Sequence, residues 1–187
     1  SVCDWSSDVC SSDLSRQEPG DARRIRGAQS GAKWGIVGDW GETAVFLGQY
    51  EHSLDEKGRL TIPSRFREEL TGRLVVTRGL DHCLFLYPYS EWQELGQRLR
   101  ALPMTQRDAR AFVRLLFAGA TEQSLDRQGR LLLPASLREY AGIERDVIIL
   151  GVANRVELWS KERWLAYETE ASQAYEELAE KIVDLGL

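Results

Sequence analysis

The chain has 187 residues, of which 43% are hydrophobic and 28% are charged, and its formal net charge is −5. This composition is typical of a globular protein with one domain of ordinary size or two small ones. No apolar run approaches the ~18 residues that a membrane helix needs, and three cysteines without a Cys-x-x-Cys pair argue against a disulfide framework or a zinc site.

The first 44 residues do not read as part of a folded domain. They are rich in Ser, Asp and Gly, and the stretch that begins at Val2 is nearly repeated from Val9. No helical or strand period persists along them. We therefore expect residues 1–44 to be a disordered leader translated from DNA outside the native coding region, with a natural disordered tail as the alternative.

The ordered pattern begins at about residue 45. We expect a strand over residues 46–53, a turn at 55–59, a short apolar strand at 60–62 and a helix opened by Pro63, because Pro suits the first helical position. Gly72 stands where a glycine is expected at the end of a helix. Two strands follow, over 73–77 and from Cys83, and then a helix capped by Ser90. A further helix is predicted over 105–117.

The same order of elements then recurs with a shift of 71 residues. SLDEKGRLTIPSRFRE from Ser53 and SLDRQGRLLLPASLRE from Ser124 are identical at nine of sixteen positions. We expect strands at 119–124 and 131–133, a helix from Pro134 to Gly142, strands at 146–150 and from 156, and a longer helix from Ser160. The repeats, residues 45–118 and 119–187, predict a duplicated α+β unit. Because one unit is too small to bury much core, we expect the two to complete each other's sheet.

Each repeat contains an Asp-x-x-Gly-Arg motif with a clear structural meaning. Aspartate accepts backbone N–H bonds in turns, and glycine three residues later supplies a positive φ. The predicted turn-forming residues are Asp55, Gly58, Asp126 and Gly129, and each turn displays the arginine that follows it, Arg59 or Arg130. Two interpretations remain open: a turn in which Arg59 only pairs with Asp55, or a rigid loop whose cations contact DNA. Turn chemistry alone explains most of the motif and favours the first.

The charge is distributed unevenly between the two repeats. Residues 45–118 hold 11 Lys and Arg against 9 Asp and Glu, a net of +2, and residues 119–187 hold 8 against 13, a net of −5. A DNA phosphate backbone contacts one face of a protein, so the charge of that face matters more than the net charge of the whole chain. The first repeat is therefore the better candidate for such a face.

The two repeats together resemble the MraZ family. The resemblance is carried by FLGQYEHSLDEKGRLTIPSRFREEL, followed in order by the second SLDRQGRLLLPASLRE, and it covers about residues 45–187. It implies a tandem-duplicated swapped-hairpin β-barrel of the AbrB-like class, with short helices and a longer C-terminal helix. It also implies a cytoplasmic, nucleoid-associated transcriptional regulator of the division and cell-wall gene cluster. Such a protein is expected to bind G-rich direct repeats of double-stranded DNA in its own promoter as a ring-shaped homo-oligomer.

The resemblance also implies which residues contact DNA. Arg59 is the first candidate for base contact with Lys57 beside it, because arginine can bind guanine O6 and N7 with two hydrogen bonds. The equivalent candidates in the second repeat are Arg130 and Arg127. There Gln128 replaces the lysine, so the first loop is expected to be the principal one. Further candidates, for phosphate contacts, are Arg65 and Arg67, although a solvated helix face is the favoured alternative for both.

Other classes of function are less well supported by the sequence. An antitoxin-like or scaffolding module that binds proteins is the alternative, since the same fold class serves that role. No Ser/His/Asp or Cys/His arrangement indicates an enzyme, and no motif indicates a cofactor, metal or small-molecule ligand. We interpret the apolar stripe of the last helix as a packing surface, formed by Trp164, Leu165, Tyr167, Ala171, Ala174, Tyr175, Leu178 and Ile182.

The codons of the leader carry one further hint. Trp is encoded only by TGG and Gly by GGN, so Trp34–Gly35 and Trp40–Gly41 each require the bases TGGGG. We therefore interpret this stretch as a translated operator that precedes a start codon at Val45. Chance in a Gly- and Trp-rich linker is the alternative.

Overall fold

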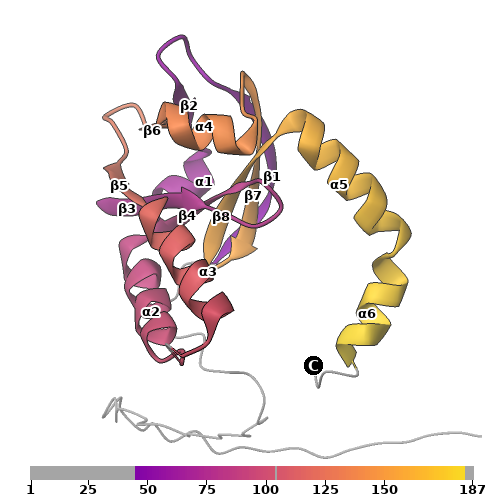
Figure 1. The fold of residues 1–187 in the computed structure, drawn as a ribbon. Coiled ribbons are helices and arrows are strands. Elements are labelled where there is room, and N and C mark those ends of the chain that lie inside the picture. Colours follow the sequence, from indigo (N-terminus) through magenta and orange to yellow (C-terminus); the bar gives the residue numbers. More distant parts are fainter. Residues whose placement is uncertain (1–44, 104, 184–187) are drawn as a thin grey trace, which may run out of the picture. The chain divides into compact units, whose positions relative to one another are not determined.

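The computed structural model describes residues 45–103 and 105–183, so the predictions for residues 1–44 lie outside the described part of the chain. The described elements confirm the α+β class (Figure 1). In chain order they are β1 (Phe46–Ser53), β2 (Arg59–Thr61), α1 (Ser64–Arg67), β3 (Arg73–Arg78), β4 (Leu84–Pro88), α2 (Tyr89–Arg100), α3 (Arg107–Ala118), β5 (Thr121–Ser124), β6 (Arg130–Leu132), α4 (Ala135–Ala141), β7 (Asp146–Ala153), β8 (Arg155–Ser160), α5 (Lys161–Gln173) and α6 (Tyr175–Val183).

The strands form a six-stranded antiparallel sheet and a separate two-stranded one. The order in the large sheet is β1-β7-β8-β4-β3-β5, and β2 pairs with β6 in the small sheet. Among the strands of residues 45–103 and 105–183, β3–β4 and β7–β8 pair within one repeat, whereas β1–β7, β4–β8, β3–β5 and β2–β6 join the two repeats. Each repeat thus supplies an outer strand to the sheet of the other, as we expected from their small size.

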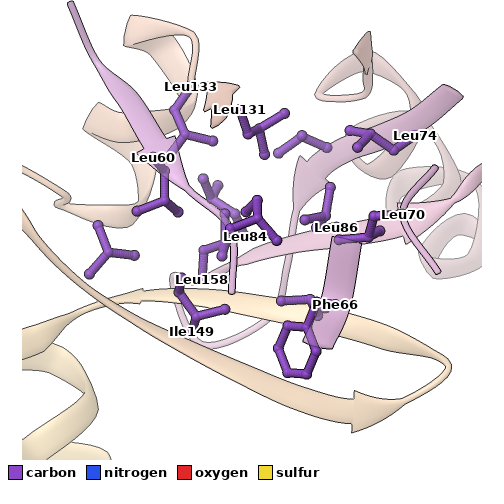
Figure 2. Packing of buried hydrophobic residues seen from close by; sticks show 14 of the residues in the cluster. Leu60, Phe66, Leu70, Leu74, Leu84, Leu86, Leu131, Leu133, Ile149 and Leu158 are labelled. Carbon is purple, nitrogen blue, oxygen red and sulfur yellow. The ribbon is translucent and has the colours of Figure 1, made fainter. Parts of the chain in front are cut away.

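One core fills the space between the large sheet, the small sheet and helices α1 and α4. Leu60 and Leu131 face each other in the β2–β6 pair and are fully buried. Figure 2 shows these side chains beside Leu84 and Leu158, so both repeats contribute to one cluster. Because the burial of apolar surface is the main favourable term in folding, this shared core ties the two repeats into a single folded body.

The other face of the large sheet carries a smaller aromatic cluster. Phe85, Tyr87 and Trp159 are buried there together with Cys83, and Trp92 of α2 packs against them. Cys83 was predicted to begin a strand in the core: it is buried, but the strand begins one residue later, at Leu84. Burial raises the pKa of the Cys83 thiol well above its usual range, so this cysteine is an inert core residue.

Two predictions about helix ends are wrong in detail. Ser90 does not cap α2, because the helix already begins at Tyr89 and follows Pro88, whose fixed φ suits a residue that precedes a helix. The long C-terminal helix is divided at Ala174 into α5 and α6. Ser160 does cap α5, since its hydroxyl accepts a hydrogen bond from the N–H of Arg163 at 3.4 Å.

The apolar stripe of the C-terminal segment is only partly used within the chain. Trp164 and Tyr167 pack on Trp159, with ring centroids 5.5 and 5.1 Å away. Leu165, Tyr175 and Ile182 are exposed. The side chain of Leu178, which belongs to the same predicted stripe, lies outside the described part of the structure. The stripe is therefore a packing surface at Trp164 and Tyr167 and an open apolar surface at Leu165, Tyr175 and Ile182.

Candidate nucleic-acid interface

The first Asp-x-x-Gly-Arg loop is held by its own aspartate. One carboxylate oxygen of Asp55 accepts hydrogen bonds from the backbone N–H groups of Lys57 and Arg59, both at 2.9 Å. The other oxygen accepts from Nε of Arg59 at 2.7 Å. The backbone adds bonds from Gly58 N–H to Asp55 C=O and from Asp55 N–H to Arg59 C=O, each 2.9 Å long. These bonds fix both the loop and the base of the arginine side chain.

The second loop repeats this arrangement atom for atom. Asp126 accepts from the N–H groups of Gln128 and Arg130 at 2.8 and 3.0 Å, and from Nε of Arg130 at 2.7 Å. Gly129 N–H donates to Asp126 C=O at 2.9 Å. Each aspartate thus accepts the hydrogen bonds of its own turn, and an ion pair between the aspartate and the arginine of the motif is formed in both repeats.

The glycines of the loops occupy conformations that other residues avoid. Gly58 has a φ of +74° and Gly129 a φ of +72°, in the left-handed region that costs other residues about 1–2 kcal/mol. Both are buried. A side chain at either position would therefore meet both backbone strain and neighbouring atoms.

The two loops lie at the same end of the molecule, above the β2–β6 pair (Figure 1). Ile62 N–H donates to Gly129 C=O and Leu133 N–H donates to Gly58 C=O, both at 3.0 Å. Nη1 of Arg130 also lies 3.9 Å from a carboxylate oxygen of Asp55. These contacts join two loops that are 71 residues apart into one surface.

The predicted cations of this surface differ in exposure. Lys57, Arg127 and Arg65 are exposed. Arg59 and Arg130 keep only 29% and 25% of their side chains accessible, because their aspartates hold them. Nη2 of Arg130 also lies 2.7 Å from the Asp126 carboxylate. Because each arginine has five N–H donors, both side chains still keep donors for a ligand, Arg130 fewer than Arg59.

Arg67 occupies a different position from the other predicted cations. It is partly buried, and its Nε donates to the carbonyl of Ile62 at 2.7 Å. Arg138, which is not among the residues predicted from the sequence, is its counterpart: its Nε donates to the carbonyl of Leu133 at 3.2 Å. The 71-residue shift that relates the two repeats also relates Arg67 to Arg138. Arg138 could therefore have been found from the sequence by applying this shift to Arg67.

The carboxylates of both loops remain ionised at neutral pH. Backbone hydrogen bonding by Arg59 is the main cause that lowers the pKa of Asp55. The side-chain hydrogen bond from Arg130 is the main cause that lowers the pKa of Asp126, to about 2. Hydrogen bonds and a nearby cation favour the charged form of a carboxyl group, so the loops keep their ion pairs through the physiological range.

The two loops therefore present a surface of small positive charge. Residues 55–59 and 126–130 hold four Lys and Arg against three Asp and Glu, a net of +1. In residues 45–103 and 105–183 there is no group of three or more His, Cys, Asp or Glu side chains that could hold a metal ion. None of the helices in those same residues is both long and apolar enough to cross a membrane.

The fold and this surface define a repeat-built α+β binding protein. The sequence model of the family described as "MraZ protein, putative antitoxin-like" matches residues 45–115 and again residues 116–185. The chain belongs to this MraZ family, whose members are transcriptional regulators rather than enzymes. The resemblance stated from the sequence is confirmed.

Several named relatives are similar over almost their whole length. A protein of Syntrophomonas wolfei named "Transcriptional regulator MraZ" is 60% identical over 143 residues, which are 76% of this chain and 100% of the relative. Relatives with the same name from Moorella thermoacetica and Pelotomaculum thermopropionicum are 57% and 56% identical over 143 residues, 76% of this chain and 100% and 99% of the relatives.

Proposed function

We propose that the protein regulates transcription by binding double-stranded DNA with its two joined loops. The observation that carries the proposal is the rigid pair of Asp-x-x-Gly-Arg loops, which brings Lys57, Arg59, Arg127 and Arg130 to one end of the molecule. A guanidinium whose Nε is already anchored loses less conformational entropy when it binds a base. Arg59 and Arg130 are proposed to bind guanine bases, while the exposed Lys57, Arg127 and Arg65 meet phosphates.

Both loops are proposed to contact DNA. The sequence favoured the first loop because of Lys57, but the exposed loop tips pair Glu56 with Lys57 in one repeat and Arg127 with Gln128 in the other. The second tip thus carries the larger net positive charge. Nε of each arginine donates to its own aspartate at 2.7 Å, and Arg130 makes further ion pairs from Nη2 to Asp126 and from Nη1 to Asp55. The shared Nε anchor supports a DNA-contacting role for both arginines.

The proposed target is the G-rich direct repeats of the protein's own promoter, in the division and cell-wall gene cluster. The resemblance to the MraZ family supports this choice, as do the TGGGG runs that Trp34–Gly35 and Trp40–Gly41 require. The protein would then act at the nucleoid in the cytoplasm.

The test is a binding titration with a duplex from the DNA upstream of the gene. Arg59→Ala and Arg130→Ala should each weaken binding by about 1–3 kcal/mol, or roughly 5- to 150-fold, because each removes a base contact. Lys57→Ala should weaken binding to all sequences and reduce the slope of log affinity against log salt by about 1. Arg98→Ala, an exposed arginine on α2 paired with Glu94, is the matched control. Unchanged affinity in all three loop variants would contradict the proposal.

We further propose that the protein assembles into a ring of identical subunits. Two different open apolar surfaces support this: Phe112 and Leu115 on α3, and Leu165, Tyr175 and Ile182 on α5 and α6. Their flanks are oppositely charged, since α3 carries exposed Arg107 and Arg114 while α6 carries exposed Glu176, Glu177 and Glu180. Contact between unlike surfaces is heterologous and builds rings when the rotation closes. Leu115→Glu should reduce the mass measured by light scattering, whereas Arg59→Ala should leave it unchanged.

A protein-binding role is the second candidate, because the matching family is described as antitoxin-like and the same apolar surfaces are open. A stoichiometric partner protein in a pull-down, together with no affinity for the upstream DNA, would favour this role.

A further inference from the structure

Two arginines, Arg67 and Arg138, make reciprocal contacts between the repeats. Arg67, on α1 of the first repeat, lies against Gly129 in the loop of the second. A Cβ built on Gly129 would stand 2.7 Å from Cδ and Cζ of Arg67, and closer still to Nε. Arg138, on α4 of the second repeat, lies against Gly58 in the loop of the first, where a Cβ would stand 3.3 Å from its Cζ and Nε.

Each of these contacts is reinforced by the backbone at the same place. Arg67 donates from Nε to the carbonyl of Ile62, and the N–H of Ile62 donates to the carbonyl of Gly129. Arg138 likewise donates to the carbonyl of Leu133, whose N–H donates to the carbonyl of Gly58. Ile62 and Leu133 therefore play the same part in the two repeats. The carbonyl of each binds the arginine of its own repeat, and the N–H of each binds the loop of the other repeat.

We propose that Arg67 and Arg138 are positioning residues that hold each DNA-binding loop in place from the opposite repeat. The planar guanidinium fills the space above a glycine where a side chain cannot fit, and its Nε–H fixes the carbonyl beside it. The shape of the first loop thus depends on a residue of the second repeat, and the reverse. The role of these arginines in recognition rests on the proposed DNA binding; their effect on the loops does not.

This role differs from the phosphate contact that the sequence suggested for Arg67. A phosphate contact depends on charge, so it survives in part when lysine replaces arginine, and its loss lowers the salt slope of binding by about 1. A positioning contact depends on the planar shape of the guanidinium and on its Nε–H, and lysine has neither. Its loss should weaken base recognition while leaving the salt slope unchanged.

The experiment compares Arg138→Ala, Arg138→Lys, Arg67→Ala and Arg67→Lys in the full chain, with Arg65→Ala as control, since Arg65 lies exposed on the same helix as Arg67. Amide hydrogen exchange is measured first, without DNA. Both Arg138 variants should speed exchange at Gly58 and Arg59, and both Arg67 variants at Gly129 and Arg130. We expect roughly tenfold changes, as for the loss of one hydrogen bond to a charged group. Arg65→Ala should leave both loops unchanged.

Binding to the upstream duplex is then measured across a salt series. Arg138→Lys and Arg138→Ala should weaken binding alike, with the wild-type salt slope. The proposal is overturned if faster exchange is confined to the loop of the mutated repeat, or if lysine restores binding and alanine lowers the slope by about 1. If the wild type does not bind the duplex, the proposed function fails, while the exchange data still decide the positioning role.

Discussion

At the scale of single residues, two of the glycines with positive φ, Gly72 and Gly129, separate backbone strain from contact. Gly72 has a φ of +79° and nothing within 4 Å of an added Cβ, whereas Gly129 has a φ of +72° and faces Arg67. Gly72→Ala should cost about 1–2 kcal/mol, the ordinary penalty of a left-handed residue. Gly129→Ala should cost about 1.5–3 kcal/mol more, because Arg67 must leave and its bond to Ile62 is lost.

Urea unfolding of both variants measures this difference. The double variant Gly129→Ala with Arg67→Ala supplies the control, since two residues in contact are not additive. Its loss of stability should be clearly smaller than the sum of the two single losses. Equal losses for Gly72→Ala and Gly129→Ala would contradict the contact seen between the arginine and the glycine.

The lowered pKa of Asp126 predicts a pH-dependent contribution to stability. A carboxyl group with a lower pKa in the folded protein stabilises the fold above its unfolded pKa, near 3.8, and the contribution is lost as pH falls through about 2. Asp126→Asn should therefore be less stable than the wild type at pH 5 and above, and the difference should shrink between pH 4 and pH 2. Thermal unfolding across pH checks this. Gln128→Ala removes no ionisable group, so its difference from the wild type should not vary with pH.

At the scale of elements, the small β2–β6 sheet supports the loops above it. Leu131 is fully buried at its centre, while the next residue, Leu132, is 49% exposed. Leu131→Ala should cost about 2–5 kcal/mol through lost burial and a cavity, and Leu132→Ala should change stability by less than about 0.5 kcal/mol. Denaturant unfolding of the two neighbours compares them directly. Similar losses of unfolding free energy in the two variants would contradict the assignment of Leu131, and not Leu132, to the core beneath the loops.

Individual strands and helix ends were largely predictable where neighbouring residues in the sequence specify them. The strand over residues 46–53 was predicted with the bounds that β1 has, and Gly142 ends α4 in the left-handed conformation. The break at Ala174 was not predictable, because no glycine or proline marks it. The contact between Arg67 and Gly129 could not be predicted either. An arginine on a short helix is expected to be a solvated cation, and only the fold brings the glycine of the other repeat against it.

At the scale of the whole molecule, the pairing of strands between the two repeats is the feature that was hardest to predict from the sequence. The repeat with a shift of 71 residues predicted two copies that complete each other. The order β1-β7-β8-β4-β3-β5 needs pairings such as Phe46 with Ala153, across more than a hundred residues. Such pairings depend on tertiary packing rather than local propensity, so the register between repeats emerges only in the folded structure.

We propose that the two repeats, residues 45–118 and 119–187, fold only together. A fragment of residues 45–118 loses β7 and β6, the partners of β1 and β2, and also loses β5 and β8 from beside β3 and β4. It leaves its half of the shared core exposed. Exposed strand edges and apolar surface make a folded monomer unstable. Circular dichroism and light scattering should therefore show either an unfolded fragment or a self-associated one, in which a second copy replaces the missing repeat. Mixing both fragments should restore the sheet signal and the assembly size that the uncut protein shows, whereas a folded monomer of residues 45–118 alone would contradict the interlocked arrangement.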